Sequence, residues 1–253
     1  AALGGIHSRT VRNQPDGTLD PTEVEAAIRA DNVHFPRSRL VCLENTHNRC
    51  YGAPLTVEYT ASIAAIAHRH GLAVHLDGAR IFNAAIALGV QAKTLAADAD
   101  SVQFCLSKGL SAPVGSLICG KADFIREARR TRKVVGGGMR QAGIIAAAGI
   151  VALEQMVDRL ADDHRHARIF AEGIAEIKGL STDLSRVRTN IMYFEVTSER
   201  ITAPQLVERL GRQGVRILST GPNQIRAVTH YGIEEKDIHE ALRIIRHVME
   251  DVA

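Results

Sequence analysis

Two stretches decide the fold of this chain: Val74-His75-Leu76-Asp77-Gly78-Ala79-Arg80 and Ser101-Val102-Gln103-Phe104-Cys105-Leu106-Ser107-Lys108-Gly109-Leu110. In each, a run of mainly apolar, β-type residues leads into a charged residue that glycine follows directly. A charge at such a position stands at the carboxyl edge of a parallel sheet, where open α/β folds bind ligands. We therefore expect an α/β fold in which Asp77 and Lys108 both lie at this edge.

The chain around these stretches alternates strand-type and helix-type patterns. Asp20 followed by Pro21 is typical of a helix start, with Asp20 as the N-cap. Apolar runs predict strands over residues 39–44, 72–77, 101–106 and 115–119. Periodic patterns predict helices over residues 56–70, 79–88 and 122–133. This alternation is typical of βαβ units, so we predict a mainly parallel sheet with flanking helices.

The second half of the chain has a different pattern. A single long helix is predicted from Arg140 to about Gly179, and its first half, apolar nearly all round, is expected to be buried. Beyond it, strands are predicted over 189–196, 215–218 and 224–229, and helices over 204–212 and 234–249. These elements predict a small C-terminal α+β domain. We place the boundary inside the long helix, with a large domain of residues 1–160 and a small domain of residues 161–253.

Lys108 is the first candidate for chemistry. Most lysines in turns are solvated surface residues, and that role is the plain alternative here. Lys108 follows a run that is expected to be buried, however, and its small neighbours Ser107, Gly109 and Ser111 leave room for a planar ring. Burial lowers the pKa of a lysine amine, and the amine needs this if it is to attack an aldehyde near neutral pH.

Asp77 and two arginines complete the pattern. As a purely structural residue, Asp77 would cap the helix that follows Gly78. Arg80 would lie on the same side of the sheet edge, where a guanidinium can pair with a substrate carboxylate. Arg226, in a short C-terminal strand, would grip that carboxylate from the opposite side, although a lone arginine there is more often a solvated charge. A Schiff-base lysine with an acid for a pyridine nitrogen is the pattern of a pyridoxal 5'-phosphate (PLP) site.

The composition argues against several other classes of protein. A formal charge of +3 over 253 residues gives no case for nucleic acid or a membrane surface. The longest apolar run, 142–153, is too short to span a bilayer. The four cysteines include no C-x-x-C pair and are interpreted as reduced, mostly buried thiols of a cytoplasmic protein. His75 and Asp77 share a strand face, but no third ligand motif accompanies them, so no metal is expected.

Five motifs appear in the order typical of one enzyme family. They are ENTHN at 44–48, VHLDGAR at 74–80, FCLSKGL at 104–110, GGGMRQ at 136–141 and IRAVTH at 225–230. Together they resemble the low-specificity L-threonine and L-allo-threonine aldolases, PLP enzymes of the aspartate-aminotransferase fold type (fold type I). The resemblance covers nearly the whole chain. It implies that Lys108 forms the Schiff base, Asp77 contacts the pyridine nitrogen, Arg80 lies beside the cofactor hydroxyl and the substrate carboxylate, and Arg226 is the second carboxylate-binding arginine.

The resemblance also implies an activity and an assembly. The expected reaction is retro-aldol cleavage of β-hydroxy-α-amino acids to glycine and an aldehyde, by a lyase that forms a homodimer or homotetramer. The family's N-terminal stretch, with its phosphate loop and ring-stacking histidine, has no counterpart here, so we expect an N-terminally incomplete large domain. Tyr51 stands where the family usually has glycine. Two alternatives stay open: another fold-type-I PLP lyase that performs β-elimination, and an inactive truncated remnant.

Overall fold

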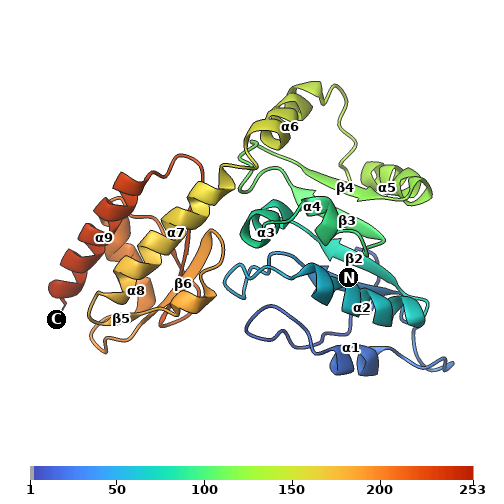
Figure 1. The fold of residues 1–253 in the computed structure, drawn as a ribbon, viewed down its shortest axis with the longest axis horizontal. Coiled ribbons are helices and arrows are strands. Elements are labelled where there is room, and N and C mark those ends of the chain that lie inside the picture. Colours follow the sequence, from blue (N-terminus) through green and yellow to red (C-terminus); the bar gives the residue numbers. More distant parts are fainter. Residues whose placement is uncertain (1–2, 253) are drawn as a thin grey trace.

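The computed structural model describes residues 3–252 and contains two β-sheets with helices packed around them (Figure 1). The strands of the first sheet, in their spatial order, are β1 (Leu40–Glu44), β2 (Ala73–Asp77), β3 (Ser101–Cys105) and β4 (Ser116–Gly120). The first three are parallel, and β4 is antiparallel to β3. The predicted α/β fold with a mainly parallel sheet is therefore confirmed.

Local signals in the sequence set the helices that flank this sheet. These helices are α1 (Pro21–Ala27), α2 (Val57–Arg69), α3 (Ile81–Leu88), α4 (Ala92–Leu95) and α5 (Ala122–Val134). The Asp20 side chain accepts a hydrogen bond from the backbone N–H of Thr22 and caps α1, as predicted. Gly89 ends α3 with a φ of 66°, a conformation that glycine adopts without steric cost. The short helix α4 was not expected from the sequence.

The core of this half lies between the parallel strands and the helices α2 and α3. Ile63 on α2, Leu76 on β2 and Ala84 on α3 are fully buried and belong to one hydrophobic cluster. Burial of this apolar surface holds the strands in register. The carboxyl ends of β1, β2 and β3 consequently meet at one edge of the sheet.

The second sheet is small and antiparallel. Its strands, in spatial order, are β5 (Leu180–Ser181), β6 (Ile191–Val196), β8 (Gln224–Val228) and β7 (Leu218–Ser219). The helical elements packed with it are α7 (Leu160–Ala175), the 3-10 helix η1 (Leu184–Arg186), α8 (Ala203–Arg212) and α9 (Glu235–Glu250). Its core contains Phe170, Phe194, Leu206, Ile225 and Ile245. The expected α+β character of the C-terminal part is thus present, although β7 begins later than predicted.

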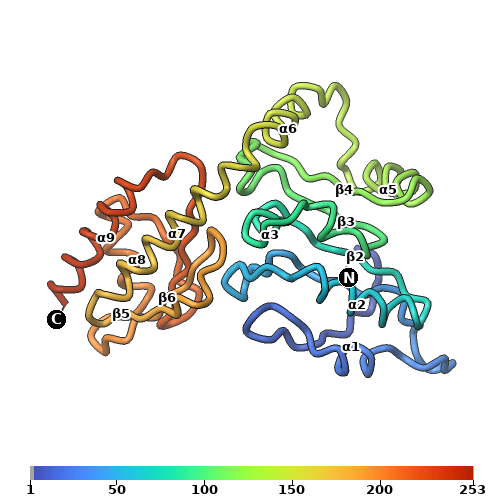
Figure 2. The backbone as a smooth tube through the Cα atoms, viewed as in Figure 1, coloured from blue at the N-terminus to red at the C-terminus, as the bar shows by residue number. Residues whose placement is uncertain are grey.

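The single helix predicted from Arg140 to about Gly179 is wrong, because the chain forms two helices there. The first, α6 (Gly143–Gln155), ends at Met156, and α7 begins after a short turn. This turn brings Leu160, which is fully buried, against the segment that follows β3. Tertiary packing here overrides a continuous helical pattern. The path of α7 from the first sheet to the second can be followed in Figure 2.

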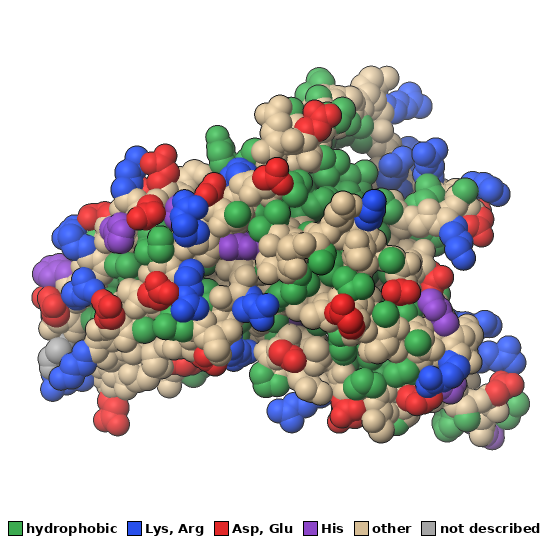
Figure 3. All heavy atoms as spheres, viewed as in Figure 1, with side chains coloured by type: hydrophobic (Ala, Val, Ile, Leu, Met, Phe, Trp, Pro, Cys, Tyr) green, Lys and Arg blue, Asp and Glu red, His purple; other side chains and the backbone are tan. Residues whose placement is uncertain are grey.

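The burial predicted for the first half of that helix is also wrong. On α6 only Gly149 and Ala152 are buried, and Ile144 is 88% exposed. Most of the large hydrophobic side chains that are exposed in the described part of the chain lie between residues 114 and 153. They belong to the segment just before β4, to β4, α5 and α6, and to the connections between them, where Figure 3 shows hydrophobic side chains gathered in its upper part.

The state of the cysteines and the lengths of the helices were also predicted from the sequence. All four cysteines are free, but Cys42 on β1 and Cys119 on β4 are exposed, so the predicted burial is wrong for these two. They lie on the two outer strands of the first sheet. Within residues 3–252, every helix is too short or too polar to cross a membrane.

Candidate active site

Asp77 lies at the carboxyl end of β2, where the sequence predicted a ligand-binding edge. Its Oδ1 atom accepts hydrogen bonds from the backbone N–H of Ala79, at 3.1 Å, and from the Nε2 group of Gln103 on β3. Glycine is needed at position 78, because a Cβ atom there would lie 2.9 Å from the carbonyl oxygen of Gln103. The Asp-Gly pair and the neighbouring strand together fix the carboxylate at the end of β2.

Lys108 lies in the turn that follows β3, the strand beside β2. Because β2 and β3 are parallel, this turn and Asp77 occupy the same edge of the sheet. The Lys108 side chain is exposed, so its predicted burial is wrong. The residues of β3 that lead to the turn are themselves only partly covered. An exposed amine at this edge is open to an incoming aldehyde.

Two arginines from different halves of the chain meet at this edge. Arg80 directly precedes α3, and Arg226 lies on β8. The Nη2 group of Arg226 donates a hydrogen bond to the Oδ1 atom of Asn48 at 2.9 Å, and Nη2 of Arg80 donates to the same atom at 3.4 Å. The structure therefore brings together the two residues that the sequence singled out for binding a carboxylate.

The electrostatics of this arrangement favour an anion. Burial, and after it the positive charge of Arg226, lower the pKa of Arg80, while Glu44, Cys105 and Asp77 act in the opposite direction. The Nε atom of Arg226 is buried and has no hydrogen-bond acceptor among the described residues. Two neighbouring guanidinium groups with an unmet donor match the two oxygens of a carboxylate. The single amide oxygen of Asn48 meets this need only in part.

Asn48 itself is held from three sides. Its backbone N–H donates to Oε1 of Glu44 at 3.0 Å, and its carbonyl oxygen accepts from the hydroxyl of Tyr193 on β6 at 3.1 Å. The loop that carries it is pinned by Asn45, whose side chain bonds to both the N–H and the carbonyl of Leu55. The loop after β1 therefore links the two sheets at the site, and Figure 1 shows it extending toward β6.

Tyr51 departs from the expected glycine in an informative way. Its backbone φ is 62°, a left-handed conformation that favours glycine. Its ring packs against Tyr193 with centroids 4.8 Å apart, and the guanidinium of Arg186 lies 3.6 Å from its ring centroid. These contacts stabilise a side chain whose backbone conformation is costly.

Sequence reasoning missed two residues at the site. Asn48 was quoted within a motif, but nothing local indicates that its amide lies between two arginines. Gln103 could have been found, because it is paired with Asp77 in the register of adjacent parallel strands. His75, weighed with Asp77 as a metal ligand, has its Nδ1 atom 2.8 Å from the hydroxyl of Ser101.

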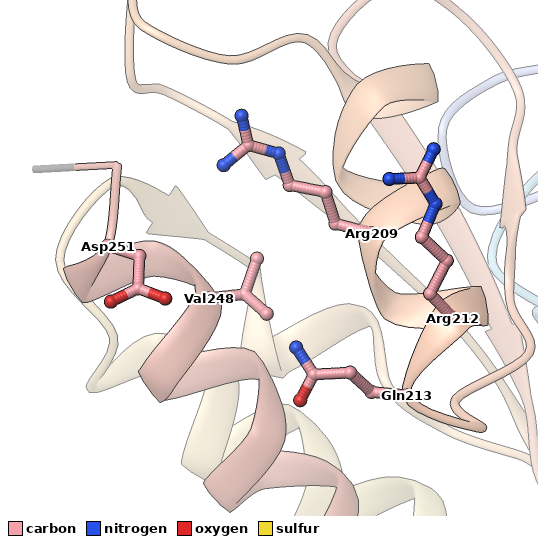
Figure 4. A pocket seen from close by; sticks show the side chains of 5 residues that line it. All are labelled: Arg209, Arg212, Gln213, Val248 and Asp251. Atoms are coloured by element: carbon pink, nitrogen blue, oxygen red, sulfur yellow. The ribbon is translucent and has the colours of Figure 1, made fainter.

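A separate hollow lies in the other half of the molecule, between α8 and α9. It measures about 210 Å³ and is lined by Arg209, Arg212, Gln213, Val248 and Asp251, as Figure 4 shows. The side chain of Arg212 is already paired with Glu208 at 2.6 Å. None of the predicted site residues lines this hollow, so the sheet edge remains the candidate active site.

The residues at the sheet edge fit PLP by their chemistry. An accessible amine and an acid at the end of the adjacent strand are the groups that hold the reactive carbon and the pyridine nitrogen of this cofactor. The arginine pair supplies a place for the carboxylate of an amino acid. Lys108, Asp77 and Arg80 are therefore the residues that could hold PLP.

Comparison with known proteins agrees with this chemistry. The sequence model of the family described as beta-eliminating lyase matches residues 1–198. Low-specificity L-threonine aldolase 1 of Arabidopsis thaliana is 44% identical over 252 residues, which cover 98% of this chain and 70% of that protein. A solved threonine aldolase of Leishmania major shares the fold, with a TM-score of 0.76 at 20% identity over 96% of this chain and 71% of that one. So does Oryza sativa TDC solved with PLP, with a TM-score of 0.75 at 16% identity over 99% of this chain and 57% of that one. On the match to its family model and its identity to the plant aldolase, this chain belongs to the beta-eliminating lyase family.

Proposed function

We propose that this chain is a PLP-dependent aldehyde-lyase that cleaves L-threonine and L-allo-threonine to glycine and an aldehyde. The observation that carries the proposal is the convergence of Arg80 and Arg226 on one oxygen, at the edge that also holds Asp77 and Lys108. The 44% identity to a low-specificity L-threonine aldolase supports the substrate class. An amino acid offers the carboxylate that the arginines need.

Each residue then has a defined task. When bound, PLP would supply a ring that accepts the electron pair released as the substrate's Cα–Cβ bond breaks. Lys108 would attach the cofactor through its amine, and Asp77 would keep a proton on the pyridine nitrogen. Arg80 would lie beside the cofactor hydroxyl. The substrate loses its β-hydroxyl proton as the aldehyde leaves, and glycine forms when Cα gains a proton.

The arginine pair determines how the substrate lies. With its carboxylate held by Arg80, at the start of α3, and by Arg226, on β8 of the second sheet, the amino acid can present its amino group to the position of the Lys108 amine. Bidentate pairing of this kind restricts rotation of the substrate, and correct orientation lowers the barrier to reaction.

The experiment that tests this proposal compares Asp77→Ala with the parent chain, supplied with PLP and L-threonine. We expect the parent to yield acetaldehyde and glycine, and Asp77→Ala to lose at least about a hundredfold in rate while PLP still attaches to Lys108. Asp98→Ala, which changes an exposed aspartate, is the matched control and should keep the parent rate. Full activity in Asp77→Ala would refute the role given to this acid.

The same assay separates the two alternatives. With L-threonine as the substrate, 2-oxobutyrate and ammonia as products would establish β-elimination, the chemistry that the family is named for. A chain to which borohydride fixes no PLP at Lys108 would be an inactive remnant. Lys108→Ala and the exposed Lys93→Ala provide the negative and matched controls for this attachment.

Three further features belong to the proposal. We infer a PLP-binding large domain over residues 1–160 and a small domain over 161–253; the two separate hydrophobic cores support this division. Self-association into a homodimer or homotetramer is supported by the exposed hydrophobic side chains between residues 114 and 153. A cytoplasmic location is supported by the four free cysteines, and cell fractionation tests it.

A further inference from the structure

The turn that carries Lys108 is fastened to the start of α7 by apolar contacts. Leu106 and Leu110, on either side of Lys108, are buried in one cluster with Leu160, the first residue of α7. Gly109 lies against the same residue, because a Cβ atom at position 109 would be 2.7 Å from Cδ2 of Leu160. Movement of α7 would therefore displace the Lys108 turn.

A polar contact accompanies this packing. Arg159 donates a hydrogen bond from Nη1 to the carbonyl oxygen of Gly109 at 3.4 Å, and its other terminal nitrogen pairs with Asp163, one helical turn along. The Asp163 side chain is fully buried, and the Arg159 side chain is 18% exposed. Tyr231 adds a further contact, with its ring centroid 5.2 Å from the guanidinium carbon of Arg159.

Asp163 also reaches the strand that carries Arg226. The hydroxyl of Thr229, just beyond the end of β8, donates to the backbone carbonyl of Asp163 at 2.5 Å. Asn190 accepts a hydrogen bond from Asn83 on α3 and donates one to the carbonyl of Thr229, which ties the same point to the first half of the chain. The first turn of α7 thus touches the Lys108 turn on one side and the end of the Arg226 strand on the other.

A buried ion pair is a costly way to hold two segments together. Burial raises the pKa of Asp163, and the hydrogen bond from Arg159 opposes this. Apolar residues of similar size often stabilise a protein at least as well as a buried pair, which can instead specify one arrangement of the chain. The Arg159 side chain contacts both the Lys108 turn, at the Gly109 carbonyl, and the ring of Tyr231 in the segment that follows β8. Asp163 holds the guanidinium in this position, so a role in specifying the arrangement of the two segments explains the ion pair.

We propose that Arg159 and Asp163 are positioning residues that fix the Lys108 turn relative to Arg226. The inference rests on the proposed function, in which Lys108 holds PLP and Arg226 holds the substrate carboxylate. In this role the ion pair sets the distance between the Lys108 amine and the substrate carboxylate, and it does not contact the substrate.

The first test measures hydrogen exchange in the chain without PLP. Two backbone hydrogen bonds report on the turn: Ser111 N–H to Lys108 O at 2.9 Å, and Ala112 N–H to Leu106 O at 3.0 Å. Arg159→Met and Asp163→Asn should speed exchange at these two amides at least about tenfold. A tenfold change corresponds to a decrease of roughly 1.4 kcal/mol in the free energy of local opening. Glu172→Gln is the matched control, because it breaks an exposed pair with Arg168 at the same spacing on the same helix. Unchanged protection in both variants would overturn the proposal.

The second test separates positioning from stability. With PLP and L-threonine, Arg159→Met and Asp163→Asn should lower kcat at least about tenfold and leave KM within about twofold, because Arg80 and Arg226 still hold the carboxylate. The double variant Arg159→Met/Asp163→Leu, with both charges removed, covers the case in which a single variant fails to fold. If it keeps the parent kcat, the pair is only structural and the proposal fails. If the parent chain attaches no PLP, the proposed function fails while the exchange experiment still decides the positioning role.

Discussion

At the scale of single residues, Asn48 shows most directly what the site is built to bind. Its Oδ1 atom accepts hydrogen bonds from two guanidinium groups, and the proposed function gives this position to one oxygen of the substrate carboxylate. The amide carries no net charge, so it does not neutralise the positive charges of the two arginines. This residue therefore holds the arginines in place and leaves their charge available to a substrate.

Replacing Asn48 with a carboxylate should turn it into a competitor of the substrate. In Asn48→Asp, the new charge would pair with Arg80 and Arg226, so we expect KM for L-threonine to rise at least about tenfold. The chain should also gain roughly 1 kcal/mol in free energy of unfolding from charge-assisted hydrogen bonds. Steady-state kinetics and urea unfolding measure both effects. In Asn48→Ala, which adds no charge, KM should stay within about threefold; an equal rise in both variants would contradict the competition.

His164 predicts a pH dependence of stability. Burial lowers the pKa of His164 from 6.5 to about 4. Between these values the unfolded chain binds a proton that the folded chain excludes, so stability falls as the pH is lowered from 6.5 to about 4. The loss is at most about 3 kcal/mol. In His164→Gln, which can still accept the hydrogen bond from Asn83, the free energy of unfolding should depend less on pH over this window. Urea unfolding at several pH values measures it, and an equal pH dependence in both proteins would refute the assignment.

At the scale of elements, α7 is the helix that joins the two halves of the molecule. Its first residue packs under the Lys108 turn, and its later residues, including Phe170 and Ile174, belong to the core of the second sheet. Figure 1 shows α9 packed along it. The contact between α7 and α9 is close at Gly173, where a Cβ atom would overlap the side chain of Leu242.

Two helical glycines should therefore respond oppositely to the same substitution. Gly173→Ala forces the buried Leu242 to shift and should lower the free energy of unfolding by about 1–3 kcal/mol. Gly211→Ala, on α8, meets no atom within 4 Å and should raise stability by roughly 0.5–1 kcal/mol, because alanine favours the helix. Thermal or urea unfolding of both variants checks this. If both substitutions changed the free energy of unfolding equally and in the same direction, the α7–α9 contact would not restrict the size of the residue at position 173.

At the scale of the whole molecule, the most unusual feature is the exposed hydrophobic surface around α6, because apolar surface in contact with water is unfavourable for a monomer. It includes Leu117 and Ile118 on β4 and Ile144, Ile150 and Val151 on α6. Large hydrophobic side chains exposed in this number are typical of surfaces that associate. The basic side chains of α5 border it in the upper right of Figure 3.

Charges placed on this surface should weaken self-association. Ile144 and Val151 are seven residues apart on α6, so they lie on one face, and the double variant Ile144→Glu/Val151→Glu should shift sedimentation toward the monomer. Leu218→Glu changes an exposed hydrophobic residue on β7 and serves as the matched control. A parent and a double variant that sediment alike would place any oligomer interface on another face.

Local patterns in the sequence determined much of this protein. The alternation of strands and helices in the first half of the chain, the N-cap at Asp20 and the acid at the end of β2 all depend on residues a few positions apart, and the structure has them as predicted. The five motifs led to the family for the same reason, because each is short and contiguous. The roles given to Asp77, Lys108, Arg80 and Arg226 remain predictions for the experiments above.

Only the tertiary structure decided how these pieces meet. Asn48 and Arg226 are 178 positions apart, and no local pattern predicts a hydrogen bond between them. The end of α6 at Met156 contains no proline or glycine to announce it, and the outward face of α6 has the composition of a buried helix. Contacts between distant segments, and the surface left without such contacts, depend on the packing of the whole chain, which sequence periodicity does not encode.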